Sequence, residues 1–251
     1  MVPQYKKLFL FYKFMHVLDE CGDARVELNK GSLCSNGKKL VLFDFDGVLV
    51  RSNHCHLKNI RDTFRESGVA LDANDAEIMR HFGKSYKVLI SDLLDDAYRT
   101  PEVEHALGKR LREKFENERF WESFERIEGL SSYLFGLRKN GYELGIASGN
   151  GHAVLEMWTT KLGIRDFFGL LIGVDDVKRG KPYPDMVFLA SEFFKVAVSD
   201  IVFVGDARSD VLMAKSAGAL SAVVLSGVLS REEAEGLCVD MIAEDVTKLD
   251  L

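Results

Sequence analysis

The feature that most constrains this chain is the segment Leu40–Val50, an apolar run that leads into Asp44 and Asp46, with Gly47 directly after them. The hydrophobic residues before Asp44 predict a buried strand. In a parallel sheet, such a strand delivers both aspartates to the carboxyl edge, where open α/β sheets bind ligands. Side-chain alternation turns the two carboxylates the same way, and they repel unless a cation lies between them or one stays protonated. A strand that simply runs into an acidic turn is the alternative for this motif alone.

A second predicted strand, 142–147, ends at Ser148, Gly149 and Asn150. This turn offers a hydroxyl and free backbone amides directly before a predicted helix, a combination that suits a phosphate oxygen. An ordinary turn or helix cap is the alternative.

Two later segments add charged residues. In Gly180–Asp185 two prolines are expected to hold the backbone extended and to present Lys181 as a fixed point charge before a helix. The predicted strand 201–204 is followed by Asp206 and Asp210, four residues apart and expected close together at a helix start. Taken singly, these residues could be a solvated lysine and a helix cap.

In this order the segments resemble the four motifs of the haloacid dehalogenase superfamily: Asp-x-Asp-Gly, a strand ending in serine, Lys-Pro-x-Pro-Asp and Gly-Asp-x-x-x-Asp. The resemblance spans residues 40–225, and four motifs agree in residue type, order and placement at strand ends. It implies that Asp44 is a nucleophile that forms an aspartyl-phosphate and that Asp46 is a general acid and base. Ser148 and the Gly149 amide would hold a phosphoryl oxygen, while Lys181 would offset negative charge.

The resemblance also implies a Mg²⁺ cofactor. Asp44, Asp206 and the main-chain carbonyl of Asp46 would bind the ion, and Asp210 would orient a metal-bound water or Lys181 from outside the ligand set. Carboxylate and carbonyl oxygens are the hard ligands that Mg²⁺ prefers.

The implied fold is an α/β, Rossmann-like, doubly wound and mostly parallel sheet core with an inserted α-helical cap domain. Alternation of predicted strands and helices supports it. The strands after the insert are expected near 142–147, 168–172, 201–204, 220–225 and 239–243. The helices are expected near 129–140, 151–163, 184–196, 207–218 and 230–237.

The insert itself has apolar residues at helical spacing: Leu57, Ile60, Phe64, Leu107, Leu111 and Phe115. It resembles the C1-type cap of phosphoglycolate-phosphatase-like and β-phosphoglucomutase-like enzymes, which closes over the site, excludes bulk water and selects the leaving group. The expected domains are an N-terminal extension (1–38), a catalytic core (39–51 and 128–251) and the cap (52–127).

Two basic residues are candidate substrate ligands. Arg51 stands at the hinge where many relatives have aspartate, and Lys84 lies in segment 81–87, where relatives place a substrate-binding loop. Either could meet an anionic tail of the substrate; exposed charges without a substrate role are the alternative. The triplet His54–His56 is badly spaced for one zinc ion and is expected in a hinge or cap loop beside the site.

Composition fits an enzyme with one substantial core and a smaller domain, at 251 residues and 47% hydrophobic content. A net charge of −6 gives no support to a nucleic-acid partner. Leu8–Leu18 is apolar but too short for a bilayer and contains Lys13, so it predicts an N-terminal helix or extension and no membrane partner. Four cysteines without Cys-x-x-Cys spacing predict reduced thiols and a cytoplasmic location.

The functional hypothesis is a Mg²⁺-dependent phosphatase of small phosphorylated metabolites, of the phosphoglycolate or sugar phosphate class. A phosphomutase of the β-phosphoglucomutase type is the runner-up. Dehalogenases and phosphonatases of the superfamily usually lack the second aspartate, so Asp46 argues against both. A non-catalytic binding protein is weaker, because Asp44, Lys181 and Asp206 are all retained as well. The sequence makes no prediction of oligomeric state.

Overall fold

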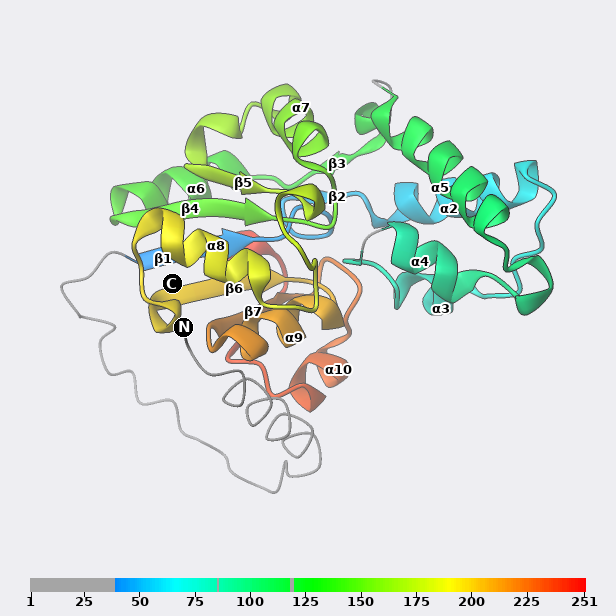
Figure 1. Ribbon diagram of the computed structural model, residues 1–251. Coiled ribbons are helices and arrows are strands. Elements are labelled where there is room, and N and C mark those ends of the chain that lie inside the picture. Colours follow the sequence, from blue (N-terminus) through cyan, green and yellow to red (C-terminus); the bar gives the residue numbers. More distant parts are fainter. Residues whose placement is uncertain (1–38, 85, 118–119) are drawn as a thin grey trace. The chain divides into compact units, whose positions relative to one another are not determined.

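The computed structural model describes residues 39–251 except 85 and 118–119, so the predictions for the N-terminal extension lie outside the described residues. A six-stranded parallel sheet in the order β5-β4-β1-β6-β7-β8 forms the core (Figure 1). Its strands are β1 (Lys39–Phe43), β4 (Tyr142–Ala147), β5 (Leu170–Ile172), β6 (Ile201–Gly205), β7 (Leu220–Val224) and β8 (Met241–Ala243). The strand order reverses at β1, which makes the sheet doubly wound and confirms the predicted α/β class.

Both faces of the sheet are covered, as the apolar strands predict. Val41 and Phe43 of β1 join a core that includes residues of α6 and α7. Leu40 and Leu42, which alternate with them, join a second core with residues of α8 and α9. The covering helices are α6 (Leu130–Lys139), α7 (His152–Leu162), α8 (Asp185–Phe194), α9 (Arg208–Ala217) and α10 (Arg231–Gly236). Each strand and helix predicted after the insert is present within two residues of its expected bounds.

The helical insert follows β1. Its helices are α2 (Asn53–Glu66), α3 (Asp75–Met79), α4 (Tyr86–Leu93) and α5 (Pro101–Glu116), which we call the cap. The apolar stripes predicted for α2 and α5 are buried, with Ile60 and Phe64 packed in one cluster with Leu107 and Leu111. Helix α5 begins as its sequence predicts, since Thr100 accepts a hydrogen bond from the Val103 amide just ahead of a proline start.

A short antiparallel ribbon joins cap and core where no strand was predicted. It pairs β2 (Val50–Arg51) with β3 (Glu125–Arg126). Strands of two residues have no periodicity to detect, so sequence patterns miss them. The 3₁₀ turns of the described chain are η1 (Asp96–Tyr98), η2 (Trp121–Ser123), η3 (Arg165–Phe167), η4 (Val174–Asp176), η5 (Val198–Asp200) and η6 (Val246–Lys248).

Two local predictions are wrong. The segment around Lys181 is not extended: it turns, and the Tyr183 amide donates a hydrogen bond to the Gly180 carbonyl at 3.1 Å. Cys55 is a buried free thiol, but Cys238 is disulfide-bonded, contrary to the expectation of reduced cysteines.

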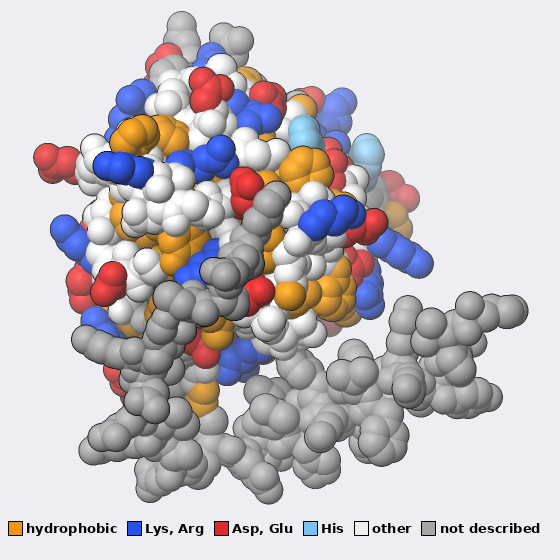
Figure 2. All heavy atoms as spheres, turned by 90° about the vertical axis from the view of Figure 1, so that its left-hand side faces the viewer, with side chains coloured by type: hydrophobic (Ala, Val, Ile, Leu, Met, Phe, Trp, Pro, Cys, Tyr) orange, Lys and Arg blue, Asp and Glu red, His pale blue; other side chains and the backbone are white. Residues whose placement is uncertain are grey.

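Among the described residues, no helix is long and apolar enough to cross a membrane. On the face shown in Figure 2, the coloured basic and acidic side chains are interspersed, without an extended basic patch among them.

Candidate active site

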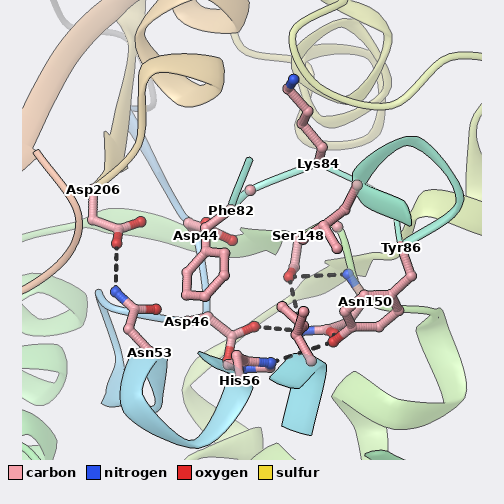
Figure 3. Close-up of a pocket in the computed structure, with 14 residues that line it drawn as sticks. Asp44, Asp46, Asn53, His56, Phe82, Lys84, Tyr86, Ser148, Asn150 and Asp206 are labelled. Carbon is pink, nitrogen blue, oxygen red and sulfur yellow. Dashed lines mark hydrogen bonds and ion pairs between the residues drawn. The ribbon is translucent and has the colours of Figure 1, made fainter. Parts of the chain in front are cut away.

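The predicted motif residues meet at the carboxyl edge of the sheet. Asp44 directly follows β1, and its amide donates a hydrogen bond to the Val204 carbonyl of β6 at 2.8 Å. A cavity of about 40 Å³ opens at this edge, between the core and the cap (Figure 3). Four predicted site residues of the core line it together with the Gly149 turn: Asp44, Asp46, Ser148 and Asp206. The topology therefore brings together residues that lie up to 162 positions apart (206 − 44).

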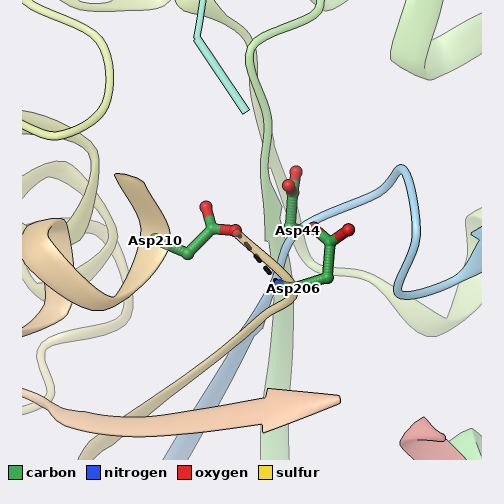
Figure 4. Close-up of side chains that lie close together, drawn as sticks. All are labelled: Asp44, Asp206 and Asp210. Atoms are coloured by element: carbon green, nitrogen blue, oxygen red, sulfur yellow. Dashed lines mark hydrogen bonds between the residues drawn. The ribbon is translucent and has the colours of Figure 1, made fainter. Parts of the chain in front are cut away.

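Three buried carboxylates lie beside the cavity. Asp44, Asp206 and Asp210 each offer one oxygen, and these oxygens lie within 4.8 Å of one another (Figure 4). The buried Lys181 ammonium lies 2.8 Å from Asp44 Oδ1 and 2.7 Å from Asp210 Oδ1. One lysine cannot neutralise three carboxylates, so the cluster lacks positive charge when all three are ionised.

The pKa shifts of these groups reflect the same excess of negative charge. Burial, partly opposed by Lys181, raises the pKa of Asp44 to about 7. Burial and the neighbouring carboxylates raise the pKa of Asp206 well above its usual value. Burial disfavours charge on Lys181 too, but Asp210 and Asp44 outweigh it and raise the pKa of the lysine to about 12. A site of this kind, with hard oxygen donors and missing positive charge, fits a divalent cation such as Mg²⁺.

Asp210 is held differently from the other two carboxylates. Its Oδ2 accepts hydrogen bonds from the Asp206 amide at 3.2 Å and the Ala207 amide at 3.0 Å, while Oδ1 faces Lys181. Both carboxylate oxygens of Asp210 therefore have partners, which hold this side chain in place at the start of α9. Asp210 lies next to Lys181, and its supporting role stays a prediction.

Asp206 is fixed by loops that approach it very closely. Its Oδ2 accepts hydrogen bonds from Asn53 Nδ2 at 3.1 Å and from the Val228 amide at 3.0 Å. A side-chain carbon at Gly47 or Gly227 would overlap the Asp206 carboxylate, and Gly47 also has a positive φ of 73°. Glycine is therefore required after the first motif, both for the turn and for the close approach.

Asp46 has a different environment from Asp44. Its carboxylate accepts hydrogen bonds from Ser52 Oγ at 2.5 Å and Asn150 Nδ2 at 2.6 Å, and lies 2.6 Å from His56 Nε2. Burial would raise the pKa of Asp46, but His56 and these donors outweigh it and lower the value. The two aspartates of one motif thus have pKa values shifted in opposite directions, a pattern typical of paired catalytic carboxylates.

Three residues near Asp46 had no predicted role. His56 lies in the first turn of α2, Asn150 follows β4, and Tyr86 begins α4. The Tyr86 hydroxyl donates to Asn150 Oδ1 at 3.3 Å and lies 3.4 Å from His56 Nδ1. For His56 the sequence did give an indication, because the His54–His56 triplet was expected beside the site. Its third residue, His56, is the one that contacts Asp46.

Ser148 and Gly149 occupy the predicted corner. The buried Ser148 Oγ accepts hydrogen bonds from Asn150, at 3.3 Å from the amide and 3.2 Å from Nδ2. Gly149 packs against the cap backbone, because a side-chain carbon there would lie 3.1 Å from the Lys84 carbonyl. The turn is therefore enclosed by the cap.

The two predicted basic ligands do not direct their charges into the cavity. Arg51 is exposed on β2, in register with Glu125, and is not a lining residue. Lys84 lines the cavity, but its ammonium lies 2.8 Å from Asp92 Oδ2, and Figure 3 shows the side chain pointing away from Asp44 and Asp46. Sequence proximity to the site was a poor guide to the direction of the Lys84 side chain, because Asp92 pairs with its ammonium.

Comparisons with known proteins agree with this geometry. The family model of haloacid dehalogenase-like hydrolases matches residues 41–224. A phosphoglycolate phosphatase of Yersinia pseudotuberculosis is 28% identical over 71% of this chain and 77% of its own length. A pyrophosphatase PpaX of Bacillus mycoides is 23% identical over 83% of this chain and 94% of its own.

Solved structures show the same fold. The crystal structure of β-phosphoglucomutase from Clostridium difficile superposes with a TM-score of 0.70 at 17% identity, covering 86% of this chain and 94% of that one. With the family match extending over most of the sequence, the chain belongs to the haloacid dehalogenase-like hydrolase family.

Proposed function

We propose that the protein is a Mg²⁺-dependent phosphatase that hydrolyses small phosphomonoesters through an aspartyl-phosphate on Asp44. The observation that carries the proposal is the pairing of two differently held aspartates in one cavity. Asp44 lies against Lys181 within the carboxylate cluster, whereas Asp46 is held by hydrogen bonds beside it. The relatives described as phosphatases support the same reaction class.

In the first half-reaction, an Asp44 carboxylate oxygen attacks phosphorus, and the bond from phosphorus to the alcohol oxygen breaks. Asp46 gives a proton to the leaving oxygen, so that the alcohol departs uncharged. In the second half-reaction Asp46 takes a proton from the water that attacks phosphorus, which releases phosphate and restores Asp44.

Other residues hold the phosphoryl group. Ser148 Oγ and the Gly149 amide line the cavity and would donate hydrogen bonds to its oxygens, while the charge of Lys181 would lie beside Asp44. Mg²⁺, held by Asp44, Asp206 and the main-chain carbonyl of Asp46, would neutralise charge on the phosphoryl oxygens.

Phosphoryl transfer to a second substrate is the alternative function. The small cavity under the cap favours it, since a phosphomutase must keep water from its aspartyl-phosphate. A single experiment separates the two functions: phosphate release and phosphorylated products are measured together over a panel of phosphorylated metabolites with Mg²⁺. Free phosphate in amounts equal to substrate consumed supports the phosphatase, whereas isomerised phosphate ester without free phosphate supports the mutase. Asp44→Asn is the control in both cases.

A further inference from the structure

We propose that this enzyme selects phosphate esters whose leaving group is an uncharged alcohol, and discriminates against leaving groups that carry a carboxylate or a second phosphate. The proposal rests on the proposed function and names its substrate class. The cavity has two walls of different character. The core wall carries the carboxylates of Asp44, Asp46 and Asp206, and the cap wall, which would face the leaving group, carries the apolar side chains of Ile60, Phe82 and Leu89.

The cap wall carries several buried apolar side chains. Ile60 of α2 and Leu89 of α4 line the cavity and are 0% and 2% exposed, and Phe82 beside them is 8% exposed. Tyr86 adds an aromatic ring, which stacks on Phe115 with ring centroids 4.4 Å apart and planes 13° apart. Besides Lys84 and His56, the described polar side chains of this wall are Tyr86 and Asn53. The Asn53 amide already donates to Asp206. The wall therefore offers mainly dispersion contacts to carbon, together with the Tyr86 hydroxyl.

The cations near this wall are already paired. Among the described residues that line the cavity, Lys84 and His56 are the ones able to carry positive charge. Lys84 pairs with Asp92 outside the cavity, and His56 pairs with Asp46. An anionic tail would have to displace one of these carboxylates to gain a cationic partner.

A charged leaving group would therefore meet a desolvation penalty. A carboxylate on it would lose water against Ile60, Phe82 and Leu89 without gaining an unpaired cationic partner, which is costly for any buried charge. An uncharged alcohol avoids this penalty: its C–H groups pack on the apolar side chains, and a hydroxyl can bond to the Tyr86 oxygen.

This inference separates the chain from the relatives to which it is similar. A phosphoglycolate phosphatase and a pyrophosphatase are named for substrates whose leaving groups are anionic. Within the class considered from the sequence, the proposal favours uncharged sugar or polyol phosphates over phosphoglycolate.

The test compares substrates that differ only in that charge. Phosphoglycolate is paired with 2-hydroxyethyl phosphate, in which a hydroxymethyl group replaces the carboxylate. 6-Phosphogluconate is paired with glucitol 6-phosphate, in which a hydroxymethyl group likewise replaces the carboxylate, and diphosphate is measured alongside. With Mg²⁺ and the full chain, we expect kcat/KM to be at least about tenfold higher for the uncharged member of each pair, equivalent to about 1.4 kcal/mol. An equal or higher kcat/KM for phosphoglycolate, 6-phosphogluconate or diphosphate would overturn the inference.

A variant tests the cause. Leu89→Lys places an ammonium on the cap wall and is expected to raise the ratio of kcat/KM for phosphoglycolate to that for 2-hydroxyethyl phosphate by about tenfold. Leu89→Met is the matched control and should leave the ratio unchanged. Circular dichroism and p-nitrophenyl phosphate hydrolysis report folding; should the lysine variant not fold, the wild-type ratios still decide.

The possible results distinguish failure of the proposed substrate class from failure of the phosphatase assignment. Hydrolysis that favours anionic leaving groups refutes the substrate class while leaving the phosphatase assignment in place. Failure to hydrolyse any phosphomonoester, including p-nitrophenyl phosphate, would overturn both.

Discussion

The core and cap walls of the cavity differ in the interactions that hold their side chains in place. On the core side the charged groups have specific polar partners: Lys181 lies between Asp44 and Asp210, and Asp46 has three hydrogen-bonding partners. The cap side carries the buried apolar side chains of Ile60, Phe82 and Leu89. Buried charges require specific partners at specific positions, whereas apolar surface requires only shape and volume. The core wall therefore suits chemistry, and the cap wall suits selection.

The largest effect on activity is expected from a substitution in the core wall. Asp44→Asn removes both the nucleophile and an anionic metal ligand while keeping the shape of the side chain, so hydrolysis of p-nitrophenyl phosphate should fall to the level without enzyme. Steady-state kinetics measure it, and the exposed Asp72→Asn is the control. Retained turnover in a folded Asp44→Asn protein would contradict the assignment of the nucleophile.

Asp46→Asn should have the next largest effect, and it should depend on the leaving group. Loss of general acid catalysis slows alkyl phosphates by roughly 10²–10⁴-fold. p-Nitrophenol needs little protonation to leave, so its ester should lose less in the first half-reaction. Equal losses of single-turnover rate for both esters would argue against the acid role of Asp46.

The carboxylate cluster predicts a pH-dependent effect of metal on stability. The pKa of Asp44 is raised from 3.8 to about 7, so the metal-free fold keeps a proton that the unfolded chain releases. Its contribution to stability is complete below about pH 4 and is lost as pH rises through about 7. Mg²⁺ replaces that proton, so thermal unfolding should show a larger Mg²⁺-induced rise in Tm at pH 8 than at pH 5.

Asp206→Ala sharpens this prediction. It removes a candidate oxygen ligand and should raise the Mg²⁺ concentration needed for activity and for stabilisation. Exposed Asp166→Ala serves as the control. A Tm that responds equally to Mg²⁺ at both pH values, or activity that survives exhaustive chelation, would mean that the cluster is not a metal site.

The smallest effect is expected where the sequence placed substrate contacts. Lys84 pairs with Asp92 at a partly exposed position, and Arg51 is exposed on β2. Exposed ion pairs contribute little, so Lys84→Ala and Arg51→Ala should change KM by less than about threefold for charged and uncharged substrates alike. A selective tenfold rise in KM for an anionic substrate would support the predicted role of Lys84 or Arg51 as a substrate ligand. It would also contradict the claim that the cap wall offers no unpaired cation to the substrate.

The sequence predicted the core wall more completely than the cap wall. The strands are continuous apolar runs, and their ends carry Asp44, Ser148 and Asp206, so strand prediction also placed the catalytic edge. The Asp46–His56 contact was not predicted, because it depends on the direction in which α2 leaves the hinge. The pairing of Lys84 with Asp92 was missed for a similar reason: it requires the path of the loop into α4, which no periodic pattern encodes.

The central claim is that Asp44 carries the phosphoryl group during turnover, and borohydride trapping tests it most directly. Reduction of an aspartyl-phosphate gives homoserine, which mass spectrometry of the peptide containing residues 40–50 can locate. We expect homoserine at the position of Asp44 when substrate and Mg²⁺ are present, and none without substrate or after chelation. Homoserine at Asp46 or Asp206 instead, or its absence during confirmed turnover, would contradict the account.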